Sequence, residues 1–264
     1  MGSLKLFFFM FIPIVELLTP DRTTIKQKLL LNWKNIHLKQ FLTYRYICNC
    51  ALGFCWIFFI NFFGNDLLGF YNQIHFRTFG YSHFRSLDFS NSILFFLIFD
   101  YSTYLWHRAN HYFKFLKNFH QVHHSDLEVD TSTTFRFHFL ELLFQLCFKV
   151  ILAFIFRIHF FYFFFFESLL LLFGYFHHAN IYLPKKLTTL ISLVLVTPRY
   201  HFNHHLLDLK YANSNYSSIL TVWDRLHGTY TAPVVEDNPA LGIKNRRSIS
   251  ELGLWQLLKM PFNL

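Results

Sequence analysis

The sequence has few charged residues for its length. Lys, Arg, Asp and Glu make up 15% of the 264 residues, whereas hydrophobic residues reach 53% and Phe alone contributes 38. A soluble domain carries more charge, typically about 25%, so the composition predicts an integral membrane protein. The net charge of +9 is that of basic loops facing an anionic leaflet. The sequence contains no compact basic recognition element of the kind that binds nucleic acid.

Cysteine is also sparse, and its spacing matches no metal site or disulfide framework. Three of the four Cys, at positions 48, 50 and 55, fall in one apolar stretch, and no C-x-x-C occurs. We expect the cysteines to be buried and to pack as small hydrophobic side chains. The sequence also lacks the H-E-x-x-H motif of zinc hydrolases and the E-x-x-H pairs of ferritin-like di-iron proteins.

Histidine, in contrast, is concentrated in clusters. The clusters are His107 with His111, then His120, His123 and His124, and then His201, His204 and His205. The last two clusters share the spacing H-x-x-H-H. Residues three and four apart lie on one face of a helix, and imidazole is a ligand for Fe, Zn, Cu or Ni. The spacing therefore predicts a metal centre.

The number of candidate ligands favours two metal ions. His177 or His178 joins the eight clustered histidines, and His138 is a further candidate; a tetrahedral zinc needs only four ligands. A ligating imidazole needs its second nitrogen held by a carboxylate, carbonyl or water. The candidate partners are Asp100, Asp126, Asn180 and Asp224. Asp100 is singled out because it lies inside an apolar run, where a carboxylate is costly.

Long apolar runs predict the spans. They are residues 47–63, 92–106 and 139–176. Residues 4–19 would be a marginal first span, an interfacial helix or a signal-like segment. The run 139–176 would form about 57 Å of helix, too long for one span and suited to a hairpin that turns near Arg157. The basic loop 20–46 is expected in the cytoplasm and the loop 64–91 on the opposite side. With the hairpin, every histidine cluster falls on the cytoplasmic side.

These expectations combine into one fold class. We predict an all-α integral membrane protein with about four to five transmembrane helices and a cytoplasmic, histidine-rich helical cap that holds a dinuclear metal site. Residues 1–91 would form the N-terminal membrane segments and basic loop. Residues 92–230 would form the catalytic domain and residues 231–264 a C-terminal cytoplasmic tail.

A histidine-rich metal pair at a membrane surface suits a lipid substrate delivered from the bilayer. One reading is an oxidoreductase in which iron activates O2 to oxidise a C–H bond. A membrane zinc hydrolase is an alternative, with Glu128 and Glu141 as the nearby candidate bases. A metal transporter or haem-carrying electron-transfer protein is another, although it would place histidine pairs within the spans.

Six motifs, taken together, resemble the fatty acid hydroxylase / sterol desaturase superfamily, and most closely its bacterial sterol desaturase proteins. In chain order they are W-H-R-A-N-H, H-Q-V-H-H-S-D, T-S-T-T-F-R-F-H, F-H-H-A-N, T-P-R-Y-H-F-N-H-H and N-Y-S-S-I-L-T-V-W-D-R-L-H-G-T. They cover roughly residues 92–230. Phe139 and His227 depart from the family pattern, which bears on subfamily and substrate rather than on the metal site.

The resemblance implies a non-haem di-iron oxygenase that hydroxylates or desaturates a sterol or fatty acyl lipid, with two iron ions (Fe2+/Fe3+) as cofactors and O2 as co-substrate. The implied ligands are the eight clustered histidines and His178, whose H-x-N element ends at Asn180, with His177 beside it. The W-D-R element, which contains Asp224, is implied as scaffold. No H-P-G-G haem-binding element occurs, so electrons are expected from a separate ferredoxin- or cytochrome b5-type donor with its reductase. The implied location is a bacterial inner membrane.

Overall fold

The structure is a computed structural model that describes residues 12, 15–16, 36–79, 89–233, 240–244 and 251–263. Within these residues the regular elements are helical, and the only strand-like pairs are two isolated bridges. The predicted all-α class is therefore confirmed for the described part of the chain. The marginal span predicted at 4–19 falls almost wholly outside the described residues.

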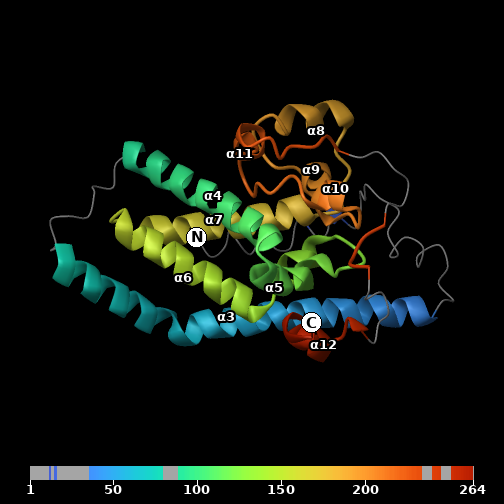
Figure 1. Cartoon of the computed structure of the whole chain (residues 1–264), viewed down its shortest axis with the longest axis horizontal. Coiled ribbons are helices and arrows are strands. Elements are labelled where there is room, and N and C mark those ends of the chain that lie inside the picture. Colours follow the sequence, from blue (N-terminus) through green and yellow to red (C-terminus); the bar gives the residue numbers. More distant parts are fainter. Residues whose placement is uncertain are drawn as a thin grey trace.

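Four long helices form the body of the molecule (Figure 1). They are α3 (Ile36–Phe79), α4 (Phe89–Tyr112), α6 (Phe139–Ile155) and α7 (Phe160–His178). Aromatic side chains fill the space between them: Phe99 of α4 lies 5.7 Å from Phe163 and 5.3 Å from Phe166 of α7, between ring centroids. Burial of such rings stabilises the packing of helices that have little polar surface to pair.

The hairpin predicted over 139–176 is confirmed. α6 ends at Ile155 and α7 begins at Phe160, with Arg157 between them at a φ of 52°. This left-handed conformation commonly ends a helix, and the Ile158 amide donates back to the Ala153 carbonyl. The Tyr71 hydroxyl of α3 donates to the Ile158 carbonyl over 2.7 Å, which ties the turn to the far end of α3.

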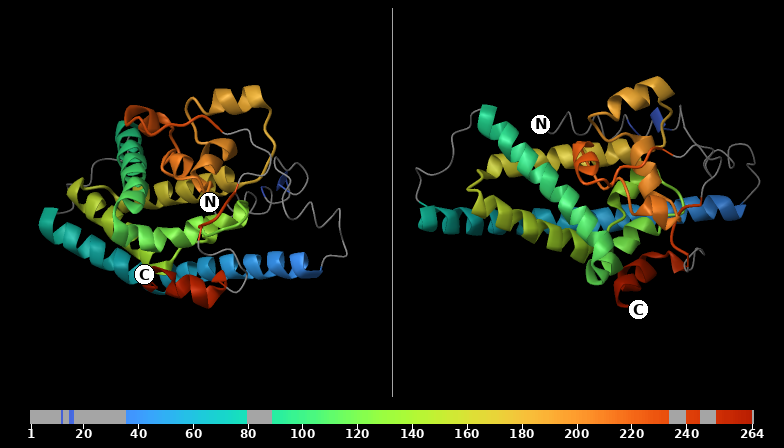
Figure 2. Two further views of the ribbon diagram at one scale, coloured as in Figure 1. Left: turned by 45° about the vertical axis from the view of Figure 1, so that its right-hand side comes forward. Right: turned by 45° about the horizontal axis from the view of Figure 1, so that its top comes forward.

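Short elements cover the opposite end of the bundle (Figure 2). They are α5 (Lys114–His124), η2 (Thr131–Phe135), α8 (Lys185–Ile191), α9 (Pro198–Phe202), η3 (Asn203–His205), α10 (Leu209–Ala212) and α11 (Val222–Leu226). The ends of α4 and α7 and the start of α6 meet them there. This end carries most of the histidines.

Residues from the predicted C-terminal tail pack against the body. α12 (Leu254–Lys259) and η5 (Met260–Phe262) follow a buried Leu252. Leu257 and Met260 are fully buried in a cluster with Leu52 of α3 and Val122 of α5. The C-terminal residues therefore pack against and stabilise α5, which carries three of the histidines.

The helix boundaries correct two predicted loops. α3 is one helix of 44 residues, so residues 36–46 and 64–79 are helical rather than parts of loops. Among the residues described, no helix has both the length and the apolar character that crossing a bilayer requires. The predicted spans therefore remain a prediction. Cys48 is buried as expected, but Cys50, Cys55 and Cys147 are exposed.

Candidate metal centre

Nine histidines gather into two groups at the covered end of the bundle. The five-histidine group consists of His107 and His111 from α4, His120 and His124 from α5, and His204 from η3. The four-histidine group consists of His123 from α5, His178 from α7, His201 from α9 and His205 from η3. Within each group the ligand atoms lie within 4.8 Å of one another. Each group could hold a metal ion.

Helix periodicity explains how neighbouring residues serve different groups. His120 and His124 are four apart on α5 and point to the same group. His123 lies between them in sequence and points to the other, where its ring centroid is 4.6 Å from that of His205. α4 supplies its pair, His107 and His111, by the same four-residue spacing. Such spacing keeps both rings of a pair on one side of a helix.

Backbone carbonyls fix the orientation of several rings. Nδ1 of His107 lies 2.7 Å from the Tyr216 carbonyl oxygen, and Nδ1 of His204 lies 2.8 Å from that of Ser214. A carbonyl oxygen only accepts, so these Nδ1 atoms carry the hydrogen and each Nε2 presents a lone pair. The Nε2 atom of His204 is buried and has no hydrogen-bond partner. A metal ion would satisfy it.

One ring of the second group is oriented in the same way. Nδ1 of His178 lies 2.8 Å from the Gly174 carbonyl oxygen, which leaves the Nε2 lone pair facing its neighbours. That Nε2 is 3.2 Å from Nε2 of His123 and 3.1 Å from Nε2 of His201. Converging imidazole nitrogens are the donor set that a divalent transition metal takes. The residues present therefore fit the implied metal pair.

Burial favours the neutral form of several of these rings. Desolvation, with the neighbouring His120 as the next cause, lowers the pKa of His107 to about 3. Burial likewise lowers the pKa of His123 and His204 well below the usual range. Neutral imidazole is the form that ligates metal. Burial therefore favours the metal-binding form of these three histidines.

A carboxylate holds His120. Glu141, in the first turn of α6, places Oε1 2.6 Å from Nδ1 of His120, and the side-chain amide of Asn110 donates to the same oxygen over 3.1 Å. Sequence reasoning considered Glu141 only as a possible base of a hydrolase. The usable signal was its position, because an ionisable residue at the start of an apolar helix needs a buried partner.

Of the predicted histidines, two lie outside both groups. His177 places Nδ1 3.2 Å from the Ser218 carbonyl oxygen, and its ring centroid is 4.1 Å from that of His201. His138 precedes α6, where its Nδ1 accepts from the Leu140 amide. His177 is thus a neighbour of the four-histidine group, and His138 is a helix cap.

Three of the four predicted partners of the ligands bind other groups through their side chains. Asp100 accepts from the Trp223 indole over 2.7 Å. For Asn180, the backbone amide donates to Glu16. Asp224 accepts from the backbone amide of Tyr216 over 2.9 Å. It reaches the site only indirectly, since Tyr216 is the residue whose carbonyl holds His107. Asp126 pairs with Arg45.

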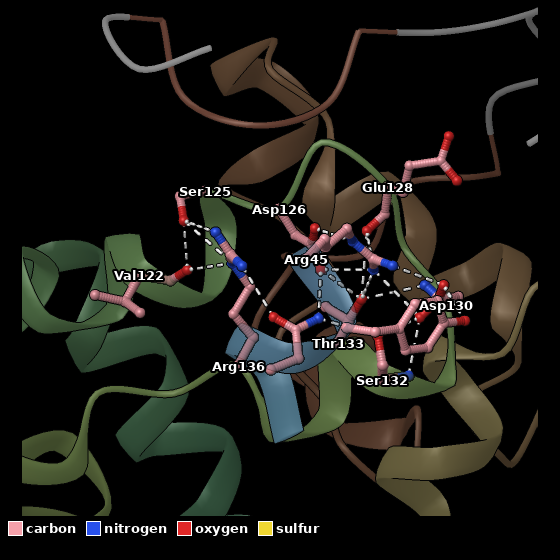
Figure 3. Close-up of polar contacts among 11 residues, drawn as sticks. Arg45, Val122, Ser125, Asp126, Glu128, Asp130, Ser132, Thr133 and Arg136 are labelled. Carbon is pink, nitrogen blue, oxygen red and sulfur yellow. Dashed lines mark hydrogen bonds and ion pairs between the residues drawn. The ribbon is translucent and has the colours of Figure 1, made fainter. Parts of the chain in front are cut away.

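A buried charge network fixes the loop that follows α5 (Figure 3). Arg45 of α3 donates from Nε to Asp126 over 2.6 Å and from Nη1 to Asp130 over 2.8 Å. Burial opposes the charge on Arg45, but the two carboxylates raise its pKa. Arg136 donates to Asn49 of α3 over 2.9 Å and to the Val122 carbonyl of α5 over 3.2 Å. These contacts anchor the end of α5 to α3, and no sequence pattern indicates them.

The fold and site together define a class: a protein helical throughout its described elements, with two histidine groups able to hold metal ions. The fatty acid hydroxylase family model matches residues 92–229, and the chain belongs to this family. This confirms the resemblance identified from the motifs. No solved structure matches the chain.

Relatives of assigned function are lipid-oxidising enzymes by name. The chain is 29% identical over 167 residues to ornithine lipid hydroxylase OlsE of Rhizobium tropici, covering 63% of this chain and 49% of the relative. It is 31% identical over 188 residues to alkylglycerol monooxygenase of Danio rerio, covering 68% of this chain and 40% of the relative. The corresponding Caenorhabditis elegans enzyme is 26% identical over 172 residues, covering 60% and 32%. The chain therefore spans about half or less of each of these relatives.

Proposed function

We propose that this protein is a membrane-bound lipid hydroxylase or desaturase that uses two iron ions, O2 and external electrons. The observation that carries the proposal is the convergence of nine histidines, most of them buried, into two groups in a chain of the fatty acid hydroxylase family. Imidazole binds several transition metals. We choose iron because the relatives are named for hydroxylation and monooxygenation, which require O2 activation.

In this proposal each histidine group holds one ion. Bound iron would supply O2 activation and removal of hydrogen from an unactivated C–H bond. The chain's own contribution is positioning: the carbonyls of Tyr216, Ser214 and Gly174 orient three rings. Phe137 stacks on His123 with centroids 4.1 Å apart and an interplanar angle of 10°. Apolar contact of this kind excludes water from the ligands.

The proposed substrate is a lipid that enters from the bilayer. Ornithine lipid and alkylglycerol are the lipids in the names of two relatives, which supports the class but does not select a member of it. Hydroxylation and desaturation begin with the same hydrogen removal, so both belong to the proposal.

Exposed apolar side chains support membrane residence. Phe54, Phe58 and Phe62 follow one another at four-residue spacing along α3, with 67%, 58% and 65% of their surfaces exposed. Consecutive rings stack at 6.4 and 5.9 Å. Ile151 and Ile155 of α6 are exposed in the same way. Soluble monomers rarely display such continuous apolar surface, so we propose that lipid covers it. We also propose that the histidine groups face the cytoplasm.

A separate electron donor is part of the proposal. Arg108, Lys114 and Lys117 are exposed beside the five-histidine group, and residues 101–125 contain no acidic residue. His111, from that group, is only partly buried. A basic surface of this kind would attract an acidic ferredoxin- or cytochrome b5-type protein. Turnover that did not slow at high ionic strength would argue against docking by charge.

The decisive experiment is metal analysis followed by an activity assay. The detergent-purified protein, expressed with iron supplied and zinc limited, should contain about two iron ions per chain. With O2, a donor and a reductase, it should then oxidise a lipid from membrane extracts, with the added oxygen traced by isotope in a hydroxylated product. Desaturation would instead remove two hydrogens from the lipid. One zinc and no iron after anaerobic iron reconstitution would contradict the proposal and favour a hydrolase.

A further inference from the structure

The two histidine groups differ in what holds their rings. In the four-histidine group, His178 is held by a neutral backbone carbonyl. In the five-histidine group, His120 is held by the carboxylate of Glu141 at 2.6 Å. A carboxylate makes imidazole a stronger metal donor than a neutral acceptor does, because it draws the Nδ1 hydrogen toward itself. The two groups are therefore chemically unequal.

The carboxylate is placed for this role by three helices. Glu141 lies in the first turn of α6, where the helix dipole favours a negative charge. Asn110 lies on α4 between His107 and His111, and its amide steadies the oxygen that contacts His120 of α5. Glu141 thus contacts side chains of α4 and α5, the two helices that carry four of the five histidines of this group.

Burial makes the charge of Glu141 effective. Only 4% of its surface is exposed, and Oε2 is buried with no hydrogen-bond partner. A carboxylate is expensive to bury unless a positive charge lies close. A divalent cation among the five histidines would provide that charge, whereas neutral imidazoles alone do not. The histidines alone therefore do not explain why a carboxylate is buried at this position.

We propose that Glu141 is a positioning residue that makes the five-histidine group the tighter of the two metal sites. This inference rests on the metal-binding part of the proposed function. The carboxylate orients the His120 ring, strengthens its Nε2 as a donor and offsets the charge of the bound ion. Loss of such a partner typically weakens metal affinity by about 10- to 100-fold.

The test isolates each site in turn. In the His205→Ala background the four-histidine group is disabled, so the remaining site is the one that Glu141 supports. In the His204→Ala background the five-histidine group is disabled and the four-histidine group remains. The full-length protein is stripped of metal and titrated with cobalt(II) alone, and bound cobalt is followed by its visible absorption. Adding Glu141→Gln should weaken binding by about 10- to 100-fold in the first background and leave it unchanged in the second.

The control is Asp208→Asn, which also converts a carboxylate to an amide. Asp208 is exposed and caps α10 through the Lys210 amide, a role that Asn also fills. Its affinities should match those of the parent backgrounds. Asn110→Ala provides a second variant that keeps Glu141 and should weaken the same site to a smaller extent, because the carboxylate loses its orientation. Thermal unfolding of each metal-free variant establishes that it is folded.

Four outcomes would overturn the inference. Equal weakening in both backgrounds would mean that Glu141 supports the whole fold. Unchanged affinity in the His205→Ala background, or in Asn110→Ala if Glu141→Gln does not fold, would mean that the carboxylate does not tune the site. If the unmodified protein binds neither cobalt nor iron, the proposed function fails and this inference fails with it. If the unmodified protein binds two cobalt ions but Glu141→Gln does not change the affinity, this inference is rejected and the proposed function is not.

Discussion

His123 and His124 are adjacent in sequence but belong to different metal-binding groups. Their ring centroids are 5.5 Å apart and their planes are nearly perpendicular, at 88°. His123 faces His178 and His205, whereas His124 faces His111 and His204. One turn of α5 therefore contributes to both sites, and the two ligand sets can be separated by single substitutions.

Replacing either residue by Ala should empty mainly one site. His123→Ala should lose the metal of the four-histidine group and His124→Ala that of the five-histidine group, so each variant should retain about one ion per chain. Metal content by mass spectrometry measures the loss. His159→Ser is the matched control, since it removes a histidine that caps α7 and Ser can replace the cap. Retention of both ions in His124→Ala would remove that residue from the ligand set.

Chelation should destabilise the folded protein. A ligand that binds only the folded state stabilises it by about 2.7 kcal/mol per site when its free concentration is 100 times its Kd. Removal of metal should therefore lower the thermal midpoint in detergent, and added metal should restore it. A midpoint that does not depend on metal concentration would mean that the histidine groups bind no ion in the folded state.

The metal-free protein should lose stability as the pH falls below about 6.5. Burial and the neighbouring histidine lower the pKa of His107 to about 3, whereas an unfolded chain returns it to about 6.5. Between these values the unfolded state binds more protons, so the free energy of unfolding falls with pH, by up to about 1.4 kcal/mol per unit for each such histidine. Denaturant unfolding at several pH values measures the slope. His107→Gln should reduce it.

Arg45→Met should strongly destabilise the protein. It leaves Asp126 and Asp130 buried without their main counter-charge, and breaking a buried pair typically costs about 3–5 kcal/mol. Denaturant unfolding measures the change. The control is Lys186→Met, which removes an exposed cation from α8. A loss below about 1 kcal/mol, the range of surface pairs, would contradict the structural role assigned to Arg45.

Two glycines of α3 should respond to alanine in opposite directions. A Cβ at Gly53 would lie 2.7 to 2.9 Å from three atoms of the Phe135 side chain, whereas none lies within 4 Å at Gly69. Gly53→Ala should therefore destabilise by about 1–3 kcal/mol through overpacking. Gly69→Ala should stabilise by up to about 1 kcal/mol, because Ala favours helix. Thermal unfolding of the two variants measures the change in midpoint that each substitution causes. Equal changes in the midpoint would contradict the close packing of η2 on α3.

The histidines and the hairpin were predictable from sequence because both depend on local spacing. Helix periodicity already places His120 and His124 on one face, and the length of the run 139–176 requires a turn, which the structure has at Arg157. The division of the ligands into groups of five and four was not predictable. It depends on how α4, α5, α7 and η3 meet, and the H-x-x-H-H spacing alone does not show which residue joins which group.

The polar partners of the site were the least predictable feature. Asp126 follows His124 closely in sequence, but the fold brings it to Arg45, 81 positions away. Glu141 is 21 positions from His120 and becomes its neighbour only because α6 begins beside α5. Such pairings depend on tertiary contact between helices, which local sequence patterns do not specify. The carbonyls of Tyr216 and Ser214 leave no sequence signal, because every residue has one.

The three residues of η3 have a consequence for the maturation of the protein. His204 completes one group and His205 the other, and in chain order they are the final ligands of both. A chain growing from its N-terminus therefore cannot finish either site until this short helix has been made and has packed. Loading of the two ions is then a late step, and truncation before residue 204 would leave both sites incomplete.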